Sequence, residues 1–459
     1  MRRAKPCLRV RFYLIQMSLI ILLAKENFDK PRRLDIPDVR MTTMKMKRSG
    51  NFEKMFLKVA TAYVEQYPEY SFKFTFDGRE IPVVGTGGRF TQVQFLHSEE
   101  LLSNMFAHGS LPLGEGYCKG WIQVKDEEYK NLLLFLVRAI NDRKILKYLT
   151  LADKVRVLKV KLSHKDRRRD DRKKNINVHY SLTDWFTDDQ SNEFFMLWLN
   201  SSYVQYSCAK WDEDTKELEE AQLNKFDWYA QRLGLNEQSK GKTLLDLGCG
   251  WGGFMFYLHE KFGLECTGIT LSTAQTKYIQ EEAARRNVNG VKVQCKDVHD
   301  MEGNYDHIVS LGMLEHIDDY GDLYEKTRRS LQGGGTALLH SMHNDGTAYK
   351  PDPFLLKYIF RIGSTPELQR NVQLLKNYFE FVDVDKLPHL SYPKTLDAWY
   401  RQYCRNENKI RALLEKSRCD DVDFAVRVFK HYLVLASAGL TVRGGVWNIL
   451  LASKTPETA

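Results

Sequence analysis

The clearest chemical signal in the sequence is the loop Asp246-Leu-Gly248-Cys-Gly250-Trp-Gly252-Gly253. It comes directly after the strand-like run Thr243–Leu247 and opens the helix-like run Trp251–Phe262. Glycines at such a junction let the backbone turn tightly and approach a ligand closely at a helix N-terminus. The loop therefore predicts a cofactor-binding turn, with a glycine turn that binds nothing as the plain alternative.

Two cofactors compete for this loop. A dinucleotide site needs the spacing G-x-G-x-x-G, which Gly248, Gly250 and Gly253 satisfy, and an acidic residue about 20 positions further on. The next strand ends instead in Thr270-Leu-Ser-Thr-Ala-Gln275, which has no carboxylate. Asp246 stands before the first glycine, and this D-x-G-x-G arrangement resembles motif I of the S-adenosylmethionine-dependent methyltransferases.

The elements that must position this loop alternate along the chain from residue 241. Hydrophobic runs typical of strands alternate with helical patterns, which predicts an α/β fold with a parallel sheet. The expected strands are Thr243–Leu247, Glu265–Ile269, Val291–Cys295, His307–Leu311 and Thr336–His340, and the expected helices are Trp251–Phe262 and Ala274–Arg286.

A smaller α+β domain is expected before this region. An amphipathic helix over residues 52–67 precedes the alternating run Phe72–Phe76, and Asp77-Gly78 is a hairpin turn signal. Further expected elements are strands at Ile81–Val84 and Phe90–Phe95, a helix capped by Ser98, and a helix over Glu127–Leu149.

Length and composition exclude several classes of protein. The 459 residues include 12% aromatic residues, too many for an intrinsically disordered chain. Lys and Arg outnumber Asp and Glu by 68 to 59, a formal net charge of +9. Lys154–Lys174 alone carries eleven basic residues against three Asp. This segment has no aromatic residue to stack on bases, so we expect no nucleic acid partner and interpret it as a linker or an exposed helical extension.

The cysteines and the N-terminus bear on the compartment. No C-x-x-C pair occurs among the eight cysteines, so we expect neither a metal site nor a disulfide scaffold. Residues 1–45 place basic residues before the apolar run Phe12–Ala24. This pattern fits a targeting segment, and an upstream start codon with Met41 or Met44 as the functional beginning explains it equally well.

Several segments in order along the chain together resemble the cyclopropane-fatty-acyl-phospholipid synthase family. They include Tyr206-Ser-Cys-Ala-Lys-Trp211, the glycine loop Leu244–Gly253, Gly268–Gln275, Ile308–His316, Leu338–His340, Gly114–Trp121, Thr395–Trp399 and Tyr432–Gly439. The resemblance runs from about residue 70 to the end. It implies a Rossmann-like class I methyltransferase domain with a mostly parallel sheet at residues 179–459, after a small α+β lipid-associated domain at 46–153 and a basic linker at 154–178.

The resemblance also implies the reaction. Members of the family transfer a methylene unit from S-adenosylmethionine to a cis double bond of an unsaturated phospholipid acyl chain, and a bound bicarbonate accepts the proton that leaves. By position, the groups that hold this anion are Cys208, Glu315, His340 and Tyr432, with the backbone of Met342. A substrate in a membrane surface implies a cytoplasmic, peripheral membrane protein, and full-length members suggest a homodimer.

The family pattern also implies the cofactor contacts. Tyr206 and Ser207 lie near the methionine part, and Thr270, Leu271 and Gln275 face the ribose and adenine. Neutral hydrogen-bonding groups thus replace the carboxylate that the second strand lacks. The full expected set is Tyr206, Ser207, Asp246, Gly248, Gly250, Gly252, Thr270, Leu271, Gln275 and Asp297.

Alternatives stay open for the residues and for the product. Taken singly, Cys208 fits a small buried hydrophobe, His340 a core histidine and Tyr432 a packing residue, while His316 could replace Glu315 as the reactive group. The product could be a methyl-branched or methylene chain instead of a ring. A small-molecule amine N-methyltransferase and a non-catalytic lipid-binding protein share the fold. Departures from the family pattern, such as Lys210 and the insertion Thr183–Gln190, leave ring formation open.

Overall fold

The structure of the chain is a computed structural model, described for residues 50–141, 148–174, 185–199, 201–317, 319–344, 352–359, 365–443 and 446–453. Residues 1–49 lie outside the described residues. The expected targeting segment and the alternative start therefore stay predictions. Gly50–Ala459 forms one compact unit, and the expected domain boundaries within it stay predictions too.

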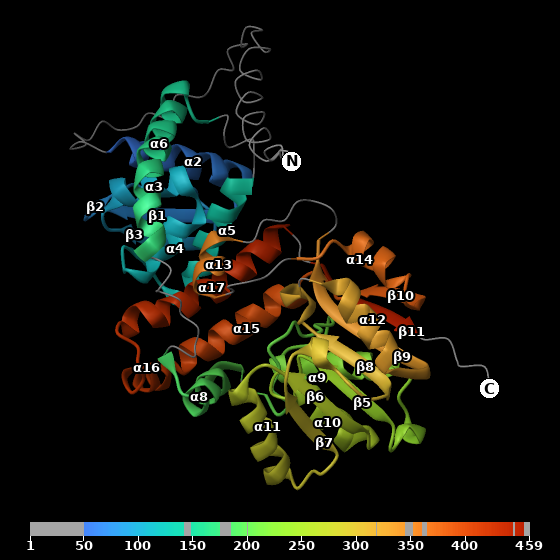
Figure 1. The fold of residues 1–459 in the computed structure, drawn as a ribbon. Helices are drawn as coiled ribbons and strands as arrows, with labels where there is room; N and C mark the ends of the chain where they lie inside the picture. Colours follow the sequence, from blue (N-terminus) through green and yellow to red (C-terminus); the bar gives the residue numbers. More distant parts are fainter. Residues whose placement is uncertain are drawn as a thin grey trace, which may run out of the picture. The chain divides into compact units, whose positions relative to one another are not determined.

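The N-terminal part of this unit builds a small mixed sheet covered by helices (Figure 1). Its elements are α2 (Asn51–Gln66), β1 (Tyr70–Phe76), β2 (Arg79–Glu80), β3 (Arg89–Phe95), α3 (Ser98–His108), α4 (Ser110–Cys118), β4 (Ile122–Val124), α5 (Asp126–Asn141) and α6 (Leu151–Lys174). The strand order is β2-β1-β3-β4, with β1 and β3 parallel and the other pairs antiparallel. An aromatic core fixes the sheet, because the ring of Phe56 packs edge-on against Phe74 at 5.1 Å.

The hairpin expected at Asp77-Gly78 is confirmed, but its second strand is not where we expected it. Both turn residues have positive φ, 47° and 81°, as a two-residue hairpin turn requires. Phe76 therefore pairs at once with Arg79, and the strand consists of Arg79–Glu80 instead of Ile81–Val84. Beyond Glu80, the amide of Ile81 still donates to Phe74 O at 2.9 Å, and Val84 forms an isolated bridge with Phe72.

The expectation that Ser98 caps a helix is wrong. α3 begins at Ser98, and the capping position is His97, which has a left-handed backbone. The Ser98 hydroxyl oxygen instead lies within hydrogen-bond distance of two carboxylate oxygens, Asp77 Oδ2 at 2.6 Å and Glu53 Oε1 at 2.5 Å, and can donate its proton to either. Contacts to residues distant in sequence thus override the local capping preference of serine.

The C-terminal part is built on a seven-stranded sheet with the order β10-β11-β9-β8-β5-β6-β7. β9, β8, β5, β6 and β7 run parallel to one another, and β11 is antiparallel to both β9 and β10. The strands are β5 (Thr243–Leu247), β6 (Glu265–Thr270), β7 (Val291–Cys295), β8 (Tyr305–Leu311), β9 (Leu331–His343), β10 (Glu380–Lys386) and β11 (Val446–Ser453). All five expected strands are present, and β9 is longer than expected at both ends.

Helices cover both faces of this sheet (Figure 1). Alternate residues of a strand face opposite sides, so Leu244 lies in one core with α9 (Leu218–Arg232), α10 (Gly253–Phe262) and α11 (Thr273–Arg286). Leu245 lies in the other core, with α12 (Tyr320–Ser330) and α14 (Leu368–Leu375). This sandwich of helices around a mostly parallel sheet confirms the expected fold class.

A third layer of helices joins the two parts. It consists of α8 (Asp188–Leu199), α13 (Pro353–Tyr358), α15 (Ser391–Arg405), α16 (Glu407–Glu415) and α17 (Val422–Arg443). Val428 of α17 belongs to the core of the N-terminal part, whereas Tyr432 belongs to the core formed with α8 and α15. Among the described residues α17 alone is long and apolar enough to cross a membrane, and most of it is buried inside the protein.

Polar contacts reinforce this junction. Lys430 Nζ donates to Asp126 Oδ2 at 2.6 Å, and the Tyr129 hydroxyl hydrogen-bonds to His431 Nδ1. Lys130 pairs with Asp397 of α15. Buried and half-buried pairs of this kind fix the orientation of one packed surface on another, because a lost partner would leave a polar group without a hydrogen bond.

The basic segment, expected as a linker or an exposed helical extension, is helical in the structure up to Lys174. α6 covers Leu151–Lys174, and its first turns pack on the N-terminal part through Val157 and Val160. Asp153 is buried and accepts hydrogen bonds from Lys58 Nζ and Arg156 Nη1, both at 3.1 Å. The basic segment is therefore attached to the N-terminal part at its start.

The closeness of α4 to α13 and α17 gives a first prediction. A Cβ at Gly114 would overlap the Phe354 ring and lie 2.7 Å from His431 Nε2. We expect Gly114→Ala to lower the thermal unfolding temperature, because overpacking costs about 1–3 kcal/mol. The control is Gly439→Ala on α17, where no atom lies within 4 Å and alanine favours the helix. Equal unfolding temperatures for the two variants in calorimetry would contradict this packing.

Candidate active site

A pocket lies at the carboxyl ends of β5, β6 and β8. The strand order reverses between β5 and β8, and open α/β sheets bind ligands at such a switch point. The pocket encloses about 200 Å³, which is room for part of an organic molecule and not just for a single water. Its lining residues are Val204, Gln205, Tyr206, Ser207, Asp246, Gly248, Cys249, Gly250, Trp251, Thr270, Gln275, Leu311, Gly312, Met313 and His316.

The glycine loop forms one wall of this pocket. Gly248, Gly250 and Gly252 all have positive φ, between 57° and 76°. This backbone conformation favours glycine over residues with a side chain. The amides of Gly248 and Cys249 both donate to Ile269 O, at 2.9 and 3.0 Å. These bonds hold the loop on β6 immediately before α10 begins, and they place the helix N-terminus beside the pocket.

Most of the expected cofactor residues line the pocket. They are Tyr206, Ser207, Asp246, Gly248, Gly250, Thr270 and Gln275. Within this set, the Thr270 hydroxyl donates to Gln275 Oε1 at 2.7 Å, which provides a neutral polar pair where a dinucleotide site would have a carboxylate.

The other three expected cofactor residues are not among the lining residues. Gly252 is the N-cap of α10, and Leu271 is 72% exposed. The carboxylate of Asp297 accepts the amide of His299 at 2.8 Å, so it caps the short helix η4 (Val298–Asp300). Their roles toward the cofactor stay predictions.

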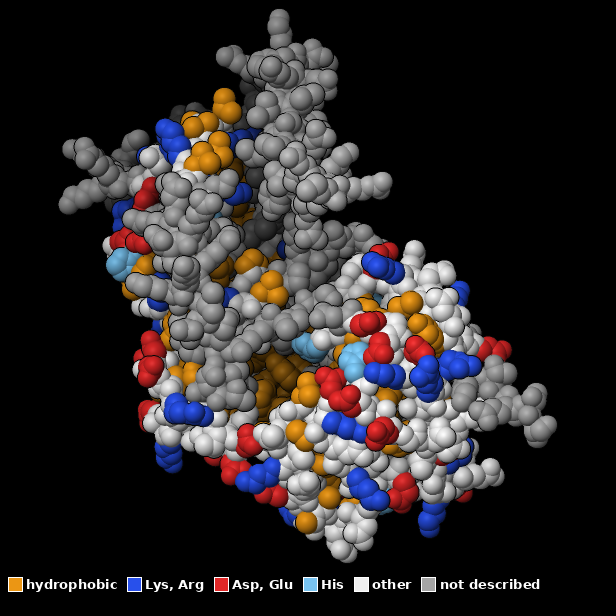
Figure 2. Space-filling model, viewed as in Figure 1, with side chains coloured by type: hydrophobic (Ala, Val, Ile, Leu, Met, Phe, Trp, Pro, Cys, Tyr) orange, Lys and Arg blue, Asp and Glu red, His pale blue; other side chains and the backbone are white. Residues whose placement is uncertain are grey.

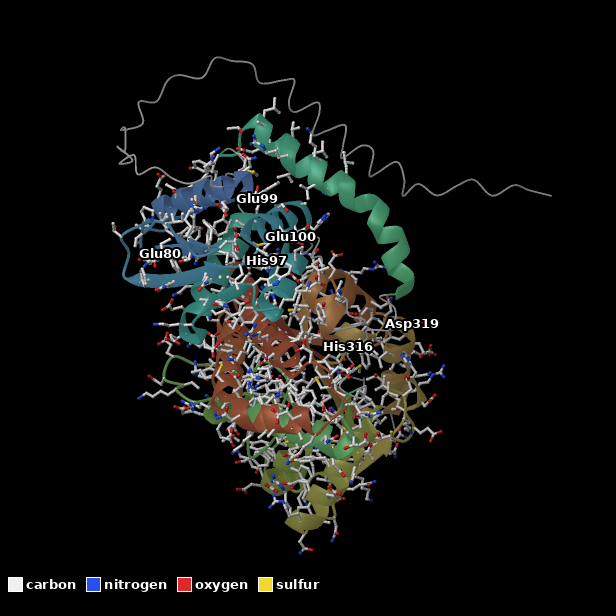
Figure 3. The ribbon with its side chains drawn as sticks, turned by 90° about the vertical axis from the view of Figure 1, so that its left-hand side faces the viewer. Glu80, His97, Glu99, Glu100, His316 and Asp319 are labelled. Carbon is white, nitrogen blue, oxygen red and sulfur yellow. The ribbon has the colours of Figure 1, made fainter. Side chains whose placement is uncertain are left out.

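Sequence reasoning missed several lining residues, among them Leu311, Gly312 and Met313. Leu311 ends the strand expected at His307–Leu311, and Gly312 and Met313 follow it directly. Because the ends of neighbouring parallel strands meet at one edge of a sheet, the residues after this strand could have been assigned to the pocket. His316, which we considered as an alternative to Glu315, lines the pocket and is exposed (Figure 3).

Asp246 is a buried carboxylate at the base of the pocket. It is 2% exposed, and within the described residues its Oδ1 has no hydrogen-bond partner. Burial raises its pKa to about 7. A cationic or hydrogen-bond-donating group of a bound ligand would supply the missing partner. A Cβ at Gly248 would lie 2.7 Å from Cγ of the pocket residue Met313, so this position has no room for a side chain.

Cys208 is completely buried beside Leu387, Met342 and Tyr392. Burial raises the pKa of its thiol well above the usual range, so the sulfur carries a proton at neutral pH. A buried neutral thiol is a weak hydrogen-bond donor.

His340 and Glu315 approach from the ends of β9 and β8. His340 is completely buried, and its Nδ1 hydrogen-bonds to the Tyr229 hydroxyl; burial lowers its pKa well below the usual range. Glu315 Oε1 accepts the amide of Met342 at 2.7 Å. Burial raises the pKa of Glu315 to about 7, and within the described residues its Oε2 is buried without a partner.

Tyr432 reaches the same region from α17. Its hydroxyl hydrogen-bonds to the hydroxyl of the pocket residue Tyr206 at 2.8 Å. Thr395 of α15 holds the adjoining chain, because its hydroxyl accepts the amide of Ala209 (3.1 Å) and the indole N–H of Trp211 (3.0 Å). The segment 206–211 is thereby fixed against two C-terminal helices.

Shared neighbours connect the four expected catalytic residues. The Met342 side chain packs against the core around Cys208 and against the core that contains Tyr432. Its amide binds Glu315, and it lies two residues after His340, on the same side of β9. Met342 thus connects Glu315 with the cluster around Cys208, and Tyr432 is joined to the pocket through Tyr206. The thiol of Cys208, the phenol of Tyr432 and the imidazole of His340 are uncharged at neutral pH. Such a set suits a small anion next to an apolar ligand.

Lys225 of α9 was not foreseen. It is completely buried, and its Nζ donates to the hydroxyl of the pocket residue Ser207 at 2.9 Å. Within the described residues no carboxylate pairs with it, and burial lowers its pKa to about 7. The spacing could have revealed this buried lysine: Lys225 is four residues from Ala221 and four from Tyr229, so the three share one face of the helix.

The sheet order, the glycine loop and the pocket define a class I S-adenosylmethionine-dependent methyltransferase. The chain belongs to the mycolic acid cyclopropane synthetase family, whose model matches residues 167–444. Cyclopropane-fatty-acyl-phospholipid synthase of Escherichia coli is 29% identical over 310 residues, which cover 66% of this chain and 74% of the relative. Cyclopropane mycolic acid synthase 1 of Mycobacterium tuberculosis is 32% identical over 259 residues, 52% and 85% of the two chains.

Solved structures agree with this assignment. Mycolic acid cyclopropane synthase CmaA1, complexed with SAH and CTAB, has a TM-score of 0.52 at 28% identity and covers 61% of this chain and 97% of its own. Coclaurine N-methyltransferase bound to N-methylheliamine and SAH has a TM-score of 0.57 and covers 74% and 98%. Its identity of 21% shows a shared fold alone. The family and the SAH complex together establish S-adenosylmethionine as the cofactor.

The loop geometry predicts how two glycine variants differ. Gly248 and Gly252 have similar φ values of 76° and 74°, so an alanine at either position introduces similar strain, about 1–3 kcal/mol. Only the first lines the pocket. We expect Gly248→Ala to weaken SAH binding by about tenfold more than Gly252→Ala, measured by titration calorimetry. Equal affinities in the two variants would refute the role of Gly248 in the pocket.

Lys225 predicts a pH-dependent stability. The pKa of lysine is about 10.4 in an unfolded chain and about 7 in this site. Between these two pKa values the unfolded state binds more protons than the folded state, so the free energy of unfolding rises with pH. The stability gained in this way disappears as the pH falls toward 7. We expect Lys225→Met to lack this rise, in thermal unfolding scans from neutral to alkaline pH. The exposed Lys216→Met is the control, and the same slope in the parent and in Lys225→Met would contradict the burial of the charge.

Proposed function

We propose that the protein transfers a methylene unit from S-adenosylmethionine to a cis double bond of an unsaturated phospholipid acyl chain and so forms a cyclopropane ring, with bound bicarbonate as the proton acceptor. The observations that carry this proposal are that Met342 binds Glu315 through its amide and packs against the cluster of Cys208, while Tyr432 hydrogen-bonds to the pocket residue Tyr206.

The protonation states of these groups favour an added base. Ring closure requires a proton to leave the carbon that the cofactor supplies. The thiol of Cys208 and the phenol of Tyr432 hold their protons, because burial raises both pKa values, and a lowered pKa makes His340 a poor base. These residues are better suited to hold an anion than to take the proton themselves. Bicarbonate would supply the base in this position.

Glu315 suits such an anion site when it carries a proton. Its pKa of about 7 means that the neutral form is well populated at neutral pH. Neutral Glu315 does not repel an anion, and its buried Oε2 can then donate a hydrogen bond. The amide of Met342 keeps the other oxygen in place.

The surroundings suit an acyl chain. Aromatic rings gather beside Tyr206, with Trp399 at 5.3 Å and Trp198 at 5.4 Å between ring centroids. An aromatic wall tolerates both an apolar chain and a positive charge that develops on it. The phospholipid form of the substrate is supported by the similarity to the Escherichia coli synthase and by the attachment of the N-terminal part to α17. We place the protein in the cytoplasm at a membrane surface; the homodimer stays a prediction.

Lipid analysis tests the proposed reaction. Cells that express the protein should contain acyl chains heavier by one CH₂, detected by mass spectrometry. Cys208→Ser and Glu315→Gln should lower the yield on the order of a hundredfold while SAH still binds. Cys266→Ser is the matched control, because Cys266 is equally buried but lies in the core of β6 with α9 and α10, whereas Cys208 packs beside Met342.

Three outcomes would count against parts of the proposal. Unchanged product in Cys208→Ser and Glu315→Gln would refute the anion site. A heavier chain without a ring, distinguished by nuclear magnetic resonance of the purified lipid, would favour the methyl-branched or methylene product. An unchanged lipid profile, with the labelled methyl group found on an amine, would favour the N-methyltransferase.

A further inference from the structure

We propose that the outer face of α6 is a docking surface for an anionic phospholipid bilayer. The proposal rests on the proposed function in one respect, namely that the substrate is a membrane lipid. It adds the surface and the residues that make the contact.

An apolar stripe runs along this face of the helix. Leu151, Val155, Leu158 and Leu162 are between 44% and 78% exposed. Their spacing of four, three and four residues puts them on one line along a helix. Ten large hydrophobic side chains of the described residues are exposed, and four of them are these. Scattered apolar residues need no explanation, but a continuous stripe does.

The opposite face of the same helix is already occupied. Val157 and Val160 pack on the N-terminal core, and the buried Asp153 is ion-paired with Lys58 and Arg156. The helix therefore cannot roll over to bury its outer stripe without breaking these contacts. Figure 3 shows α6 running along the outside of the N-terminal part.

Lysines border the stripe on both sides. On a helical projection Lys154 and Lys161 lie along one edge and Lys159 along the other; all three are exposed, and no ion pair within the described residues involves them. Figure 2 shows hydrophobic side chains with Lys or Arg beside them over the first half of α6. An apolar stripe between rows of lysine is the pattern of a helix that lies in a membrane interface, where the charged ends reach the headgroups.

The charge favours a membrane over a second copy of the chain. A two-fold contact through this face would bring Lys154, Lys159 and Lys161 of both copies together, and the rest of the helix adds seven more basic residues up to Lys174. An anionic bilayer instead attracts the same lysines and accepts the leucines. A bilayer surface offers both partners that this face of α6 needs, namely lipid tails for the apolar stripe and phosphate groups for the lysines.

Vesicle binding of the full-length chain tests the proposal. We expect the protein to co-sediment with vesicles of phosphatidylcholine and phosphatidylglycerol, and far less with phosphatidylcholine alone. Val155→Gln/Leu158→Gln should reduce binding to the mixed vesicles about tenfold. Lys154→Gln/Lys159→Gln/Lys161→Gln should remove the preference for phosphatidylglycerol and most of the salt dependence. Leu390→Gln is the control, because Leu390 is exposed to a similar degree, 46%, and lies outside α6.

The result that overturns the proposal is parent-like vesicle binding by the α6 variants. A change from dimer to monomer in Val155→Gln/Leu158→Gln, measured by analytical ultracentrifugation with vesicle binding intact, would assign the face to a second copy instead. Activity on detergent-dispersed lipid separates this proposal from the proposed function. The α6 variants should keep that activity, whereas a parent protein that binds vesicles but forms no heavier acyl chain would refute the reaction and leave the docking surface standing.

Discussion

Two adjacent residues of α17 form hydrogen bonds to the N-terminal part and to the cofactor pocket. His431 hydrogen-bonds to Tyr129 of the N-terminal part, and Tyr432 hydrogen-bonds to Tyr206 in the pocket. Successive side chains of a helix point about 100° apart, so one turn of α17 faces both. The polar contacts of the active site and of the junction are thus set by the same backbone, and a shift of this helix at the junction would be felt at Tyr206.

The catalytic region depends on burial more than on charge. Its acids, Asp246 and Glu315, have pKa values raised to about 7, and its buried base, Lys225, has a pKa lowered to about 7. Desolvation is the first cause in each case, and it shifts acids and bases toward their neutral forms. In the proposed reaction, a lipid chain would enter this region without charged acids and bases to displace. The net charge of the protein is concentrated elsewhere, in α6.

Much of the fold could be predicted from the sequence, because the signals involved are local. β5 has the expected bounds, since a buried parallel strand is a continuous apolar run, and the glycine loop follows from the positive φ values that it needs. The hairpin at Asp77-Gly78 is present for the same reason. The bounds of its second strand and the cap at Ser98 were wrong, because residues far along the chain decide where pairing stops and where the Ser98 hydroxyl binds.

The site was predictable in part, and the resemblance to a family supplied what spacing could not. Seven of the ten expected cofactor residues line the pocket, because they follow strands whose ends must meet. Leu271 and Asp297 also follow strands, but one side chain points to solvent and the other caps η4. Lys225 was missed because the sequence of α9 does not indicate which residues its buried face contacts. Only the structure shows that the Lys225 side chain reaches the Ser207 hydroxyl.

The order in which the site is completed follows from contacts over long distances in sequence. Tyr206 is joined to a residue 226 positions further on, and Ala209 to one 186 positions further on. A ribosome delivers the glycine loop and the strands β5 to β8 long before it delivers α15 and α17. The nascent chain can therefore form its cofactor loop while the segment 206–211 still lacks its anchors. The last helices to be synthesised complete the catalytic region, so a chain that ends early has the cofactor loop and lacks the residues that would act beside it.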